Sequence, residues 1–374
     1  MRPAMILVVL LAASVAVFRA GPGARAGEID TAAGRVSITP VLTGLDEPWS
    51  LAFLPGGGFL VTERGGRLLH VEAGRVQPVA GLPEIEVDGQ GGLFDVLVPR
   101  DFAATREVFL SYAAPQGRDS GTALARAGLS QDGSQLEGLR VLFAQAPGSS
   151  GGRHFGGRIL EGADGHLFLT IGDRGDDDSA QDPASHNGTV VRLNRDGSVP
   201  AGNPFAGQPG ARREIWSYGH RNPQGAALDA EGRLWVHEHG ARGGDEVNLV
   251  LPGANYGWPV IAYGRHYTGL PIGEGTHKEG MEQPALYWDP SIAPSGMAVY
   301  SGRLWPEWAG DMFVGSLKFD MIARLERDGE GWREAERLAA PETGRVRDIR
   351  EAPDGSLWFL SVHEGAVFRM APAE

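Results

Sequence analysis

Two arginines spaced two residues apart, Arg345 and Arg347, mark one candidate anion site. Residues i and i+2 of a strand point to the same face, so the two guanidinium groups would repel each other unless an anion lies between them. Lys318 and Lys278 are the only two lysines in a chain with 34 Lys and Arg residues. Since the chain strongly prefers arginine, a position that has lysine suggests a need for its compact ammonium group. Solvated surface positions would explain these arginines and lysines equally well.

A second set of residues could supply a base and hydrogen bonds. His154 lies in the glycine-rich segment SSGGRHFGG, where an imidazole can act as a general base, although a lone histidine is more often structural. The segment HRNPQ, residues 220–224, brings Arg221 and Asn222 into one turn. Such side chains suit a ligand with carboxylates and ring carbonyls, and an ordered turn between blades is the alternative. Gln90 stands in DGQGG, whose glycines permit close approach of a ligand to the backbone.

Metal-like and nucleotide-binding patterns are weak. His237 and His239 would share one face of a strand with Glu238 on the other, which is not the helical spacing of zinc proteases. The three aspartates at 176–178 are typical of a solvated loop. Neither a phosphate-binding loop nor a dinucleotide fingerprint occurs between a strand and a helix.

The elements that must position these residues are short strands. A phrase made of an apolar run, a polar turn and a second apolar run occurs six times, and Asp-Gly or Gly-Gly in the turn indicates hairpins. The copies begin at Leu51, Phe94, Ile159, Ala227, Ala298 and Ile349. Six such repeats predict an all-β fold. We expect a six-bladed β-propeller of four-stranded antiparallel blades, as one domain over residues 27–374. Two β-sandwiches would not explain six similar phrases.

Composition and the N-terminal segment limit the possible environments and partners. The net charge of −13 disfavours nucleic-acid binding, and the absence of cysteine excludes disulfides. The apolar run Ala4–Phe18, followed by Ala24-Arg25-Ala26, predicts a signal peptide over residues 1–26 and a periplasmic location. The run is short for a membrane span, and an uncleaved anchor is the alternative.

The chain resembles the soluble dehydrogenases for aldose sugars and glucose that depend on pyrroloquinoline quinone (PQQ). The resemblance covers about residues 42–370 and rests on ordered phrases, among them EPWSLAFLP, GQGGLFDV, GGRHFGGR, YGHRNPQG, HGARGGDEVNLV, GSLKF and GRVRDIR. It implies PQQ near the propeller axis with Ca²⁺ beside it. It also implies oxidation of aldoses at C1 to lactones by hydride transfer to PQQ, and an external electron acceptor.

The resemblance also assigns roles to individual residues. His154 matches the general base, and Arg221 is expected to stabilise the developing oxyanion. The positions that match PQQ-holding residues are Gln90, Arg221, Asn222, Lys318, Arg345 and Arg347. Gly240 and Ala241 match the positions whose carbonyls bind the cofactor's calcium, although the second position is commonly Pro. Glu246 and Tyr256 resemble a second, structural calcium site.

Two other functions stay open at this point. One is a calcium-dependent propeller hydrolase such as a lactonase, which would need acidic side chains converging on the axis. The other is a binding propeller without enzymatic activity. For each of the three functions we expect a monomer without stable membrane insertion.

Overall fold

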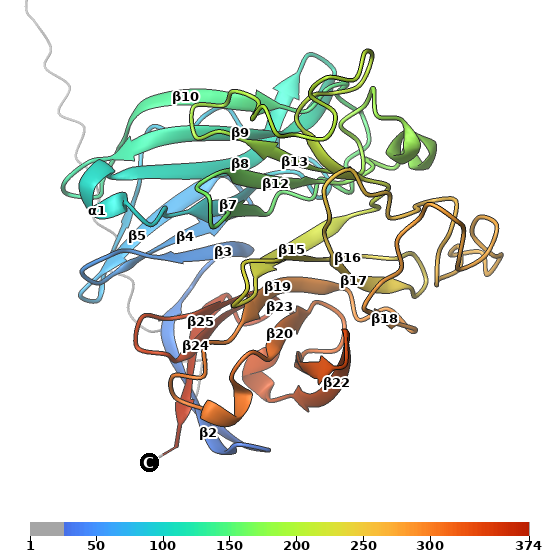
Figure 1. Cartoon of the computed structure of the whole chain (residues 1–374). Coiled ribbons are helices and arrows are strands. Elements are labelled where there is room, and N and C mark those ends of the chain that lie inside the picture. Colours follow the sequence, from blue (N-terminus) through green and yellow to red (C-terminus); the bar gives the residue numbers. More distant parts are fainter. Residues whose placement is uncertain (1–25, 374) are drawn as a thin grey trace, which may run out of the picture.

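Six antiparallel sheets surround a common axis in the computed structural model, which describes residues 26–373 (Figure 1). The first three blades follow one another along the chain. They consist of β3 (Pro48–Phe53), β4 (Phe59–Glu63), β5 (Arg67–Glu72) and β6 (Arg75–Pro78); β7 (Leu93–Leu97), β8 (Glu107–Gln116), β9 (Asp119–Leu129) and β10 (Leu136–Ala144); and β11 (Ile159–Glu161), β12 (Leu167–Ile171), β13 (Thr189–Leu193) and β14 (Ile215–Tyr218).

The remaining three blades complete the ring. They consist of β15 (Pro223–Leu228), β16 (Leu234–Glu238), β17 (Asp245–Leu249) and β18 (Leu286–Trp288); β19 (Pro294–Val299), β20 (Met312–Ser316), β21 (Ile322–Asp328) and β22 (Gly331–Leu338); and β23 (Val346–Glu351), β24 (Leu357–Ser361) and β25 (Ala366–Pro372), joined by β2 (Gly34–Thr43) and β1 (Gly27–Thr31). The helices in the described part are α1 (Phe102–Thr105), η1 (Asp177–Gln181), η2 (Pro306–Trp308) and η3 (Pro341–Thr343).

The predicted fold is confirmed, and each repeated phrase supplies the first two strands of one blade. The innermost strands β3, β7, β11, β15, β19 and β23 each contact their neighbours around the axis. The sixth sheet differs from the prediction in having a fifth strand, because both β2 and β1 extend it. The predicted signal peptide lies outside the described residues, except for Ala26. Within residues 26–373, no helix is long and apolar enough to cross a membrane.

The Gly-containing turns of the phrases have one recurrent geometry. Four of the inner hairpins close with a hydrogen bond from the N–H of the first turn residue to the carbonyl four residues later, over residues 54–58, 162–166, 229–233 and 352–356. The fourth residue of each is a glycine with positive φ: Gly57, Gly165, Gly232 and Gly355. Glycine adopts this left-handed conformation without the steric cost of a Cβ, which is why the turns carry it.

A buried ionic cluster ties the inner strands together at the hub. The Arg158 guanidinium lies 3.2 Å from an Asp95 oxygen and 3.1 Å from an Asp348 oxygen. Arg350 contacts the same two carboxylates at 3.1 and 3.0 Å. These residues belong to the second, third and sixth blades, and the Leu51 N–H of the first blade donates to Asp348. Two arginines balance two aspartates, so no charge in the cluster is left without an opposite partner.

Candidate active site

β-Bulges at the start of the inner strands aim side chains toward one end of the axis. The pairing register shifts near the first residues of β3, β7, β15, β19 and β23. A bulge inserts an extra residue and redirects its side chain, which is why bulges are common beside active sites. Trp49, Phe94, Gln224 and Arg347 lie at these bulges, and all four line a single cavity.

Residues with left-handed backbone precede three of these strands. Glu47, Ala293 and Arg345 have φ values of 46°, 52° and 51° and stand immediately before β3, β19 and β23. All three line the cavity. His154 has φ of 53° in the loop ahead of β11. Such conformations are costly for residues with a Cβ, and they gather at functional sites where the surrounding structure enforces them.

The cavity has a volume of about 750 Å³ and receives residues from all six blades, so it surrounds the axis. It brings together six of the residues singled out from the sequence: Gln90, Asn222, Ala241, Lys318, Arg345 and Arg347. Sequence reasoning missed other lining residues, namely Trp49, Arg64, Phe94, Phe155, Arg242 and Tyr267, whereas Gln224 and His239 stood in motifs that it had considered. Trp49 and Phe94 occupy bulge positions, which single-sequence patterns do not reveal.

Arg347 is a cation of this cavity whose charge an anionic ligand would neutralise. Within residues 26–373 it forms no ion pair, and its guanidinium packs on the Trp49 ring at 4.3 Å. Burial, then the positive charge of Arg158, lowers the pKa of Arg347 to about 9, and Arg345 and Arg64 act in the same direction. The charged groups of Lys318 and Arg345 line the same cavity and also form no ion pair in the described part of the chain, although the Arg345 main-chain N–H donates to Asp320 at 2.7 Å. The cavity is therefore built for a negatively charged ligand.

His154 lies beside this cavity. It is not among the lining residues, but its neighbours Phe155 and Gly156 are, and its side chain is 11% exposed. Its N–H donates to Gln90 Oε1 at 2.8 Å, and its Nδ1 lies 2.7 Å from Asp173 Oδ1. Because the Asp173 carboxylate accepts a hydrogen bond at this contact, Nδ1 carries the hydrogen and Nε2 has the free lone pair of a base.

Asp173 holds the imidazole in place and was not assigned a role from the sequence. It is fully buried, and it also accepts hydrogen bonds from Trp258 Nε1 at 2.8 Å and from the Gly175 N–H at 2.6 Å. The signal that could have found it is the segment IGDRG, in which an aspartate stands two residues after the end of β12.

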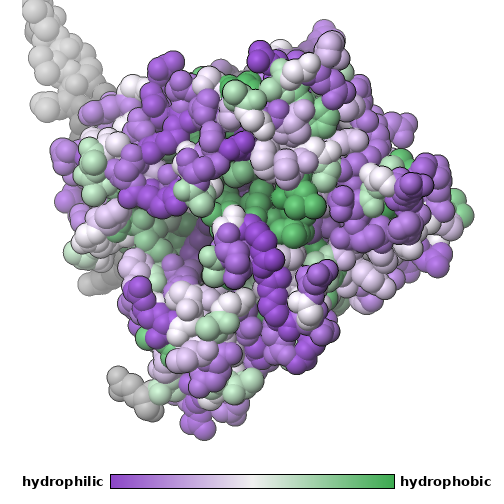
Figure 2. All heavy atoms as spheres, viewed as in Figure 1, coloured by the Kyte–Doolittle hydropathy of each residue, from purple (hydrophilic) through white to green (hydrophobic). Residues whose placement is uncertain are grey.

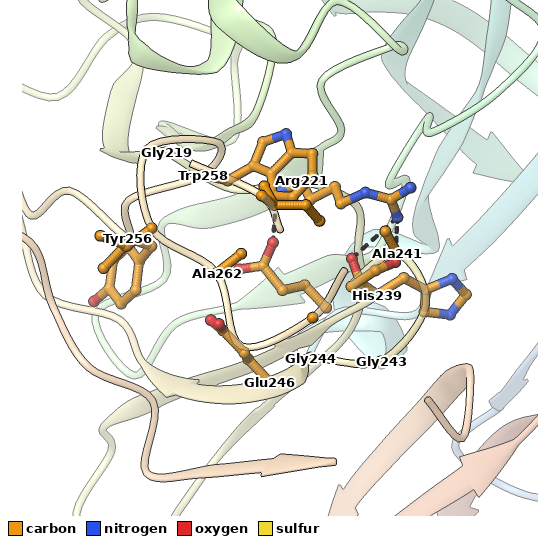
Figure 3. Close-up of a pocket in the computed structure, with 15 residues that line it drawn as sticks. Gly219, Arg221, His239, Ala241, Gly243, Gly244, Glu246, Tyr256, Trp258 and Ala262 are labelled. Atoms are coloured by element: carbon orange, nitrogen blue, oxygen red, sulfur yellow. Dashed lines mark hydrogen bonds between the residues drawn. The ribbon is translucent and has the colours of Figure 1, made fainter. Parts of the chain in front are cut away.

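Arg221 lies in a second, much smaller cavity of about 20 Å³ (Figure 3). Its Nη1 donates to the carbonyls of Gly240 and, at 3.3 Å, of His239, and its guanidinium lies 5.1 Å from the Trp258 ring. Gly240, Ala241, Glu246 and Tyr256 line this cavity as well. Ala241 and His239 line both cavities, so the two adjoin. The predicted calcium residues are therefore together, whereas Arg221 is not among the lining residues of the large cavity.

Two carboxylates, the buried Glu238 and the half-buried Glu246, face this small cavity. Glu238 and Glu246 are directly opposite each other on β16 and β17, and the Asn248 side-chain amide donates to both, at 3.3 and 3.2 Å. Burial, then the negative charge of Glu238, raises the pKa of Glu246 to about 8. Two like charges held together away from water favour a cation between or beside them.

The hydroxyl of Tyr256 is engaged in hydrogen bonds to the main chain and does not point to a role as a metal ligand. Its hydroxyl donates to the Leu249 carbonyl at 2.6 Å and accepts from the Leu251 N–H at 2.9 Å, and its ring stacks on His220 at 4.5 Å. The main-chain carbonyl is the oxygen that Tyr256 would offer to a metal. The weak His237–His239 pattern stays unassigned: His237 is fully buried, and His239 Nε2 lies 2.6 Å from the Pro294 carbonyl.

Comparison with known proteins identifies the family. The family model described as Glucose / Sorbosone dehydrogenase matches residues 45–369. The aldose sugar dehydrogenase YliI of Escherichia coli strain K12 is 41% identical over 346 residues, covering 90% of this chain and 93% of that protein. The chain belongs to the glucose/sorbosone dehydrogenase family.

Solved structures of similar proteins agree with this assignment. The apo-form of the E. coli aldose sugar dehydrogenase is 40% identical, with a TM-score of 0.88 over 90% of this chain and 100% of that one. The PQQ-bound aldose sugar dehydrogenase of Streptomyces coelicolor is 28% identical, with a TM-score of 0.74 over 92% of this chain and 99% of that one. The glucose/sorbosone dehydrogenase match extends across both cavities, and this member of the family is an oxidoreductase.

Proposed function

We propose that this protein is an exported, monomeric quinoprotein that oxidises aldose sugars at C1 to lactones with PQQ and Ca²⁺. The observation that carries the proposal is that the side chains of Lys318, Arg345 and Arg347 line one hub cavity and form no ion pair with any residue that the structure describes. PQQ has three carboxylates, and charge-assisted hydrogen bonds to them would compensate these cations. The PQQ-bound relative supports this choice of anion.

The uncharged polar groups of the cavity suit the rest of such a ligand. Gln90, Asn222 and Gln224 offer amide donors and acceptors for ring carbonyls, and Trp49, Phe94 and Phe155 offer flat apolar surface. PQQ, when bound there, would supply the two-electron acceptor that receives the C1 hydrogen as a hydride. The cavity volume of about 750 Å³ falls in the usual range for small-molecule sites.

The protein's own contribution to the reaction centres on His154. Asp173 keeps the hydrogen of His154 on Nδ1, which leaves Nε2 free to take the proton of the anomeric hydroxyl. Gln90 fixes the backbone of His154 through its N–H. Trp258 and Gly175 keep the Asp173 carboxylate in position beside the imidazolium that forms, so that it can stabilise it.

The donor set of the small cavity fits calcium. Ca²⁺ prefers carbonyl and carboxylate oxygens, which Gly240, Ala241 and the Glu238–Glu246 pair provide. The Gly240 carbonyl accepts a hydrogen bond from Arg221 and keeps a second lone pair for a metal. We assign Gly240 and Ala241 to the calcium beside PQQ, and Glu246 with the Tyr256 carbonyl to the structural one. Arg221 would then lie near the developing oxyanion.

A reconstitution experiment tests the function. Purified apo-protein is mixed with PQQ and Ca²⁺ and given glucose and a dye acceptor, and dye reduction that depends on both additions is expected. Lactone cleavage without PQQ would instead indicate a hydrolase, and inactivity in both assays would indicate a binding propeller.

Replacement of His154 tests the assignment of the base. His154→Gln should lower turnover by about 100-fold or more while PQQ still binds, since general bases contribute on this scale. His277→Gln, at an exposed position, is the matched control and should keep turnover. Wild-type turnover in His154→Gln would remove His154 from this role.

Export is tested by cell fractionation of the full chain. The proposal expects the protein in the periplasmic fraction with Gly27 as its first residue. Recovery in the membrane fraction with the apolar run still attached would contradict it.

A further inference from the structure

We propose that Arg64 is a positioning residue that fixes the Gln90 loop against His154. Arg64 lies in the turn between β4 and β5 of the first blade. Its Nη1 donates to the carbonyls of Gly89 and Gly91, at 3.0 and 2.9 Å. One guanidinium nitrogen therefore holds the main chain on both sides of Gln90. Neither the sequence motifs nor the proposed function gave this residue a role.

The Arg64 side chain is itself fixed on its other side. Its Nη2 lies 2.5 Å from Glu47 Oε2, and its N–H donates to the Glu47 carbonyl at 3.0 Å. The Arg64 carbonyl accepts the Leu93 N–H at 3.0 Å, at the first residue of β7. Side chain and main chain together thus connect the start of the first blade's inner strand to the loop that enters the second blade. We call this arrangement of Glu47, Arg64 and the two glycine carbonyls the Arg64 clasp.

The Gln90 loop transmits this constraint to His154. The Gln90 N–H donates to the Gly152 carbonyl at 2.7 Å, and Gln90 Oε1 accepts the His154 N–H at 2.8 Å. The loop therefore lies between the Arg64 guanidinium on one side and residues 152–154 on the other. His154 has a left-handed backbone, which needs such external contacts to persist. Loss of the Arg64 clasp should let both segments relax together.

Hydrogen exchange of the apo-protein tests the clasp without any need for activity. In Arg64→Met, the amides of peptides covering residues 88–92 and 152–156 should exchange on the order of tenfold faster than in the wild type. Arg75→Met removes an exposed arginine of the same blade and should leave both peptides unchanged. Glu47→Gln removes only the ionic partner and should accelerate the same peptides to a smaller extent. Unchanged exchange in Arg64→Met would overturn the proposal, and so would acceleration spread over all blades.

A kinetic measurement, which rests on the proposed function, separates positioning from direct PQQ contact. With saturating PQQ, Arg64→Met should lower kcat on the order of 10- to 100-fold with little change in KM for glucose, because a small displacement of a reacting group has this effect. Arg64→Lys, which can still donate to one carbonyl, should recover part of the loss. Full recovery of Arg64→Met by excess PQQ would assign Arg64 to ligand binding and overturn the positioning role. A wild type that is inactive with PQQ would refute the proposed function, while the exchange result would still decide on the clasp.

Discussion

At the residue scale, the side chain of Asp173 decides which nitrogen of His154 can act as a base. It lies 2.7 Å from Nδ1 and is itself held by two donors. Asp173→Asn keeps the shape but removes the negative charge that stabilises the imidazolium. We expect kcat to fall by about 100-fold or more, with PQQ affinity little changed. Steady-state kinetics and PQQ titration measure the two effects, and equal kcat values would show that Asp173 does not act through His154.

Arg347 should lower the stability of the apo-protein and strengthen the binding of PQQ. Its pKa of about 9, below the usual value of 12.5, means that Arg347, charged at neutral pH in both states, is held less favourably in the folded apo-protein than in the unfolded chain. Arg347→Met removes this cost and should raise the melting temperature of the apo-protein by about 2 °C. The same change should weaken PQQ binding by about 10- to 100-fold, since it removes a charge-assisted contact.

The two effects have opposite signs, so scanning calorimetry and PQQ titration together test the assignment. Arg350→Met is the contrasting variant. It leaves the buried Asp95 and Asp348 short of a partner, and it should lower the melting temperature. A lower melting temperature in Arg347→Met would contradict the interpretation of Arg347 as an unpaired cation.

The sequence could identify residue types but not their partners. A histidine in a glycine-rich loop and three basic residues near the C-terminus suggested a base and an anion site, but the resemblance to a known family was needed to assign these roles. Asp173, Trp258 and Arg64 could not be assigned, because the partners that give them a role, His154, Asp173 and Gly89, lie 19, 85 and 25 residues away along the chain. Single-sequence patterns describe neighbours at short spacing, whereas these contacts depend on how blades meet.

At the element scale, the side chains of Arg345 and Arg347 reach the same cavity for a different reason from the one that the alternation of side chains along a regular strand predicts. Arg345 precedes β23 with left-handed backbone, and a bulge separates Val346 from Asp348. The two guanidinium groups reach one cavity through this irregular start and not through a regular pleat. Regular periodicity thus brought the two residues together for an incomplete reason, since bulges leave no clear mark in the residue types.

The loop that carries Gln90 depends on one glycine in particular. Gly89 has φ of +54°, and a Cβ there would lie 2.3 Å from the Gly152 carbonyl oxygen. Gly89→Ala should therefore push the Gln90 loop away from residues 152–154 and lower kcat by about tenfold or more. Gly117→Ala is the matched control, because Gly117 has φ of +74° but nothing within 4 Å of its Cβ position. Equal activities of the two variants would show that backbone strain, and not contact with Gly152, determines the effect.

At the scale of the whole molecule, the six repeated phrases were enough to predict six blades, but not how the ring closes. The closing strands β1 and β2 precede the first phrase, and β2 pairs with β25 over the register Val36↔Pro372 to Thr43↔Ala366. Chain segments from opposite ends therefore share one sheet. Local patterns could not reveal this pairing, because its specificity comes from the apolar groups that β2 buries and not from a turn. Val36 and Ile38 are fully buried in the same cluster as Phe359 and Phe368.

Removal of the closing strand should therefore destabilise far more than its length suggests. A variant that begins at Gly44 lacks β1 and β2, exposes the edge of β25 and uncovers the cluster that contains Val36 and Ile38. We expect loss of cooperative unfolding and aggregation, since an uncovered strand edge pairs with other chains. A variant that begins at Gly34 lacks only β1, whose pairing partner is β2 at the sheet edge, and should stay folded with a melting temperature a few degrees lower. Calorimetry and light scattering distinguish the two. A stable, monomeric variant beginning at Gly44 would show that the hub contacts of the six inner strands, and not the closing strand, hold the ring together.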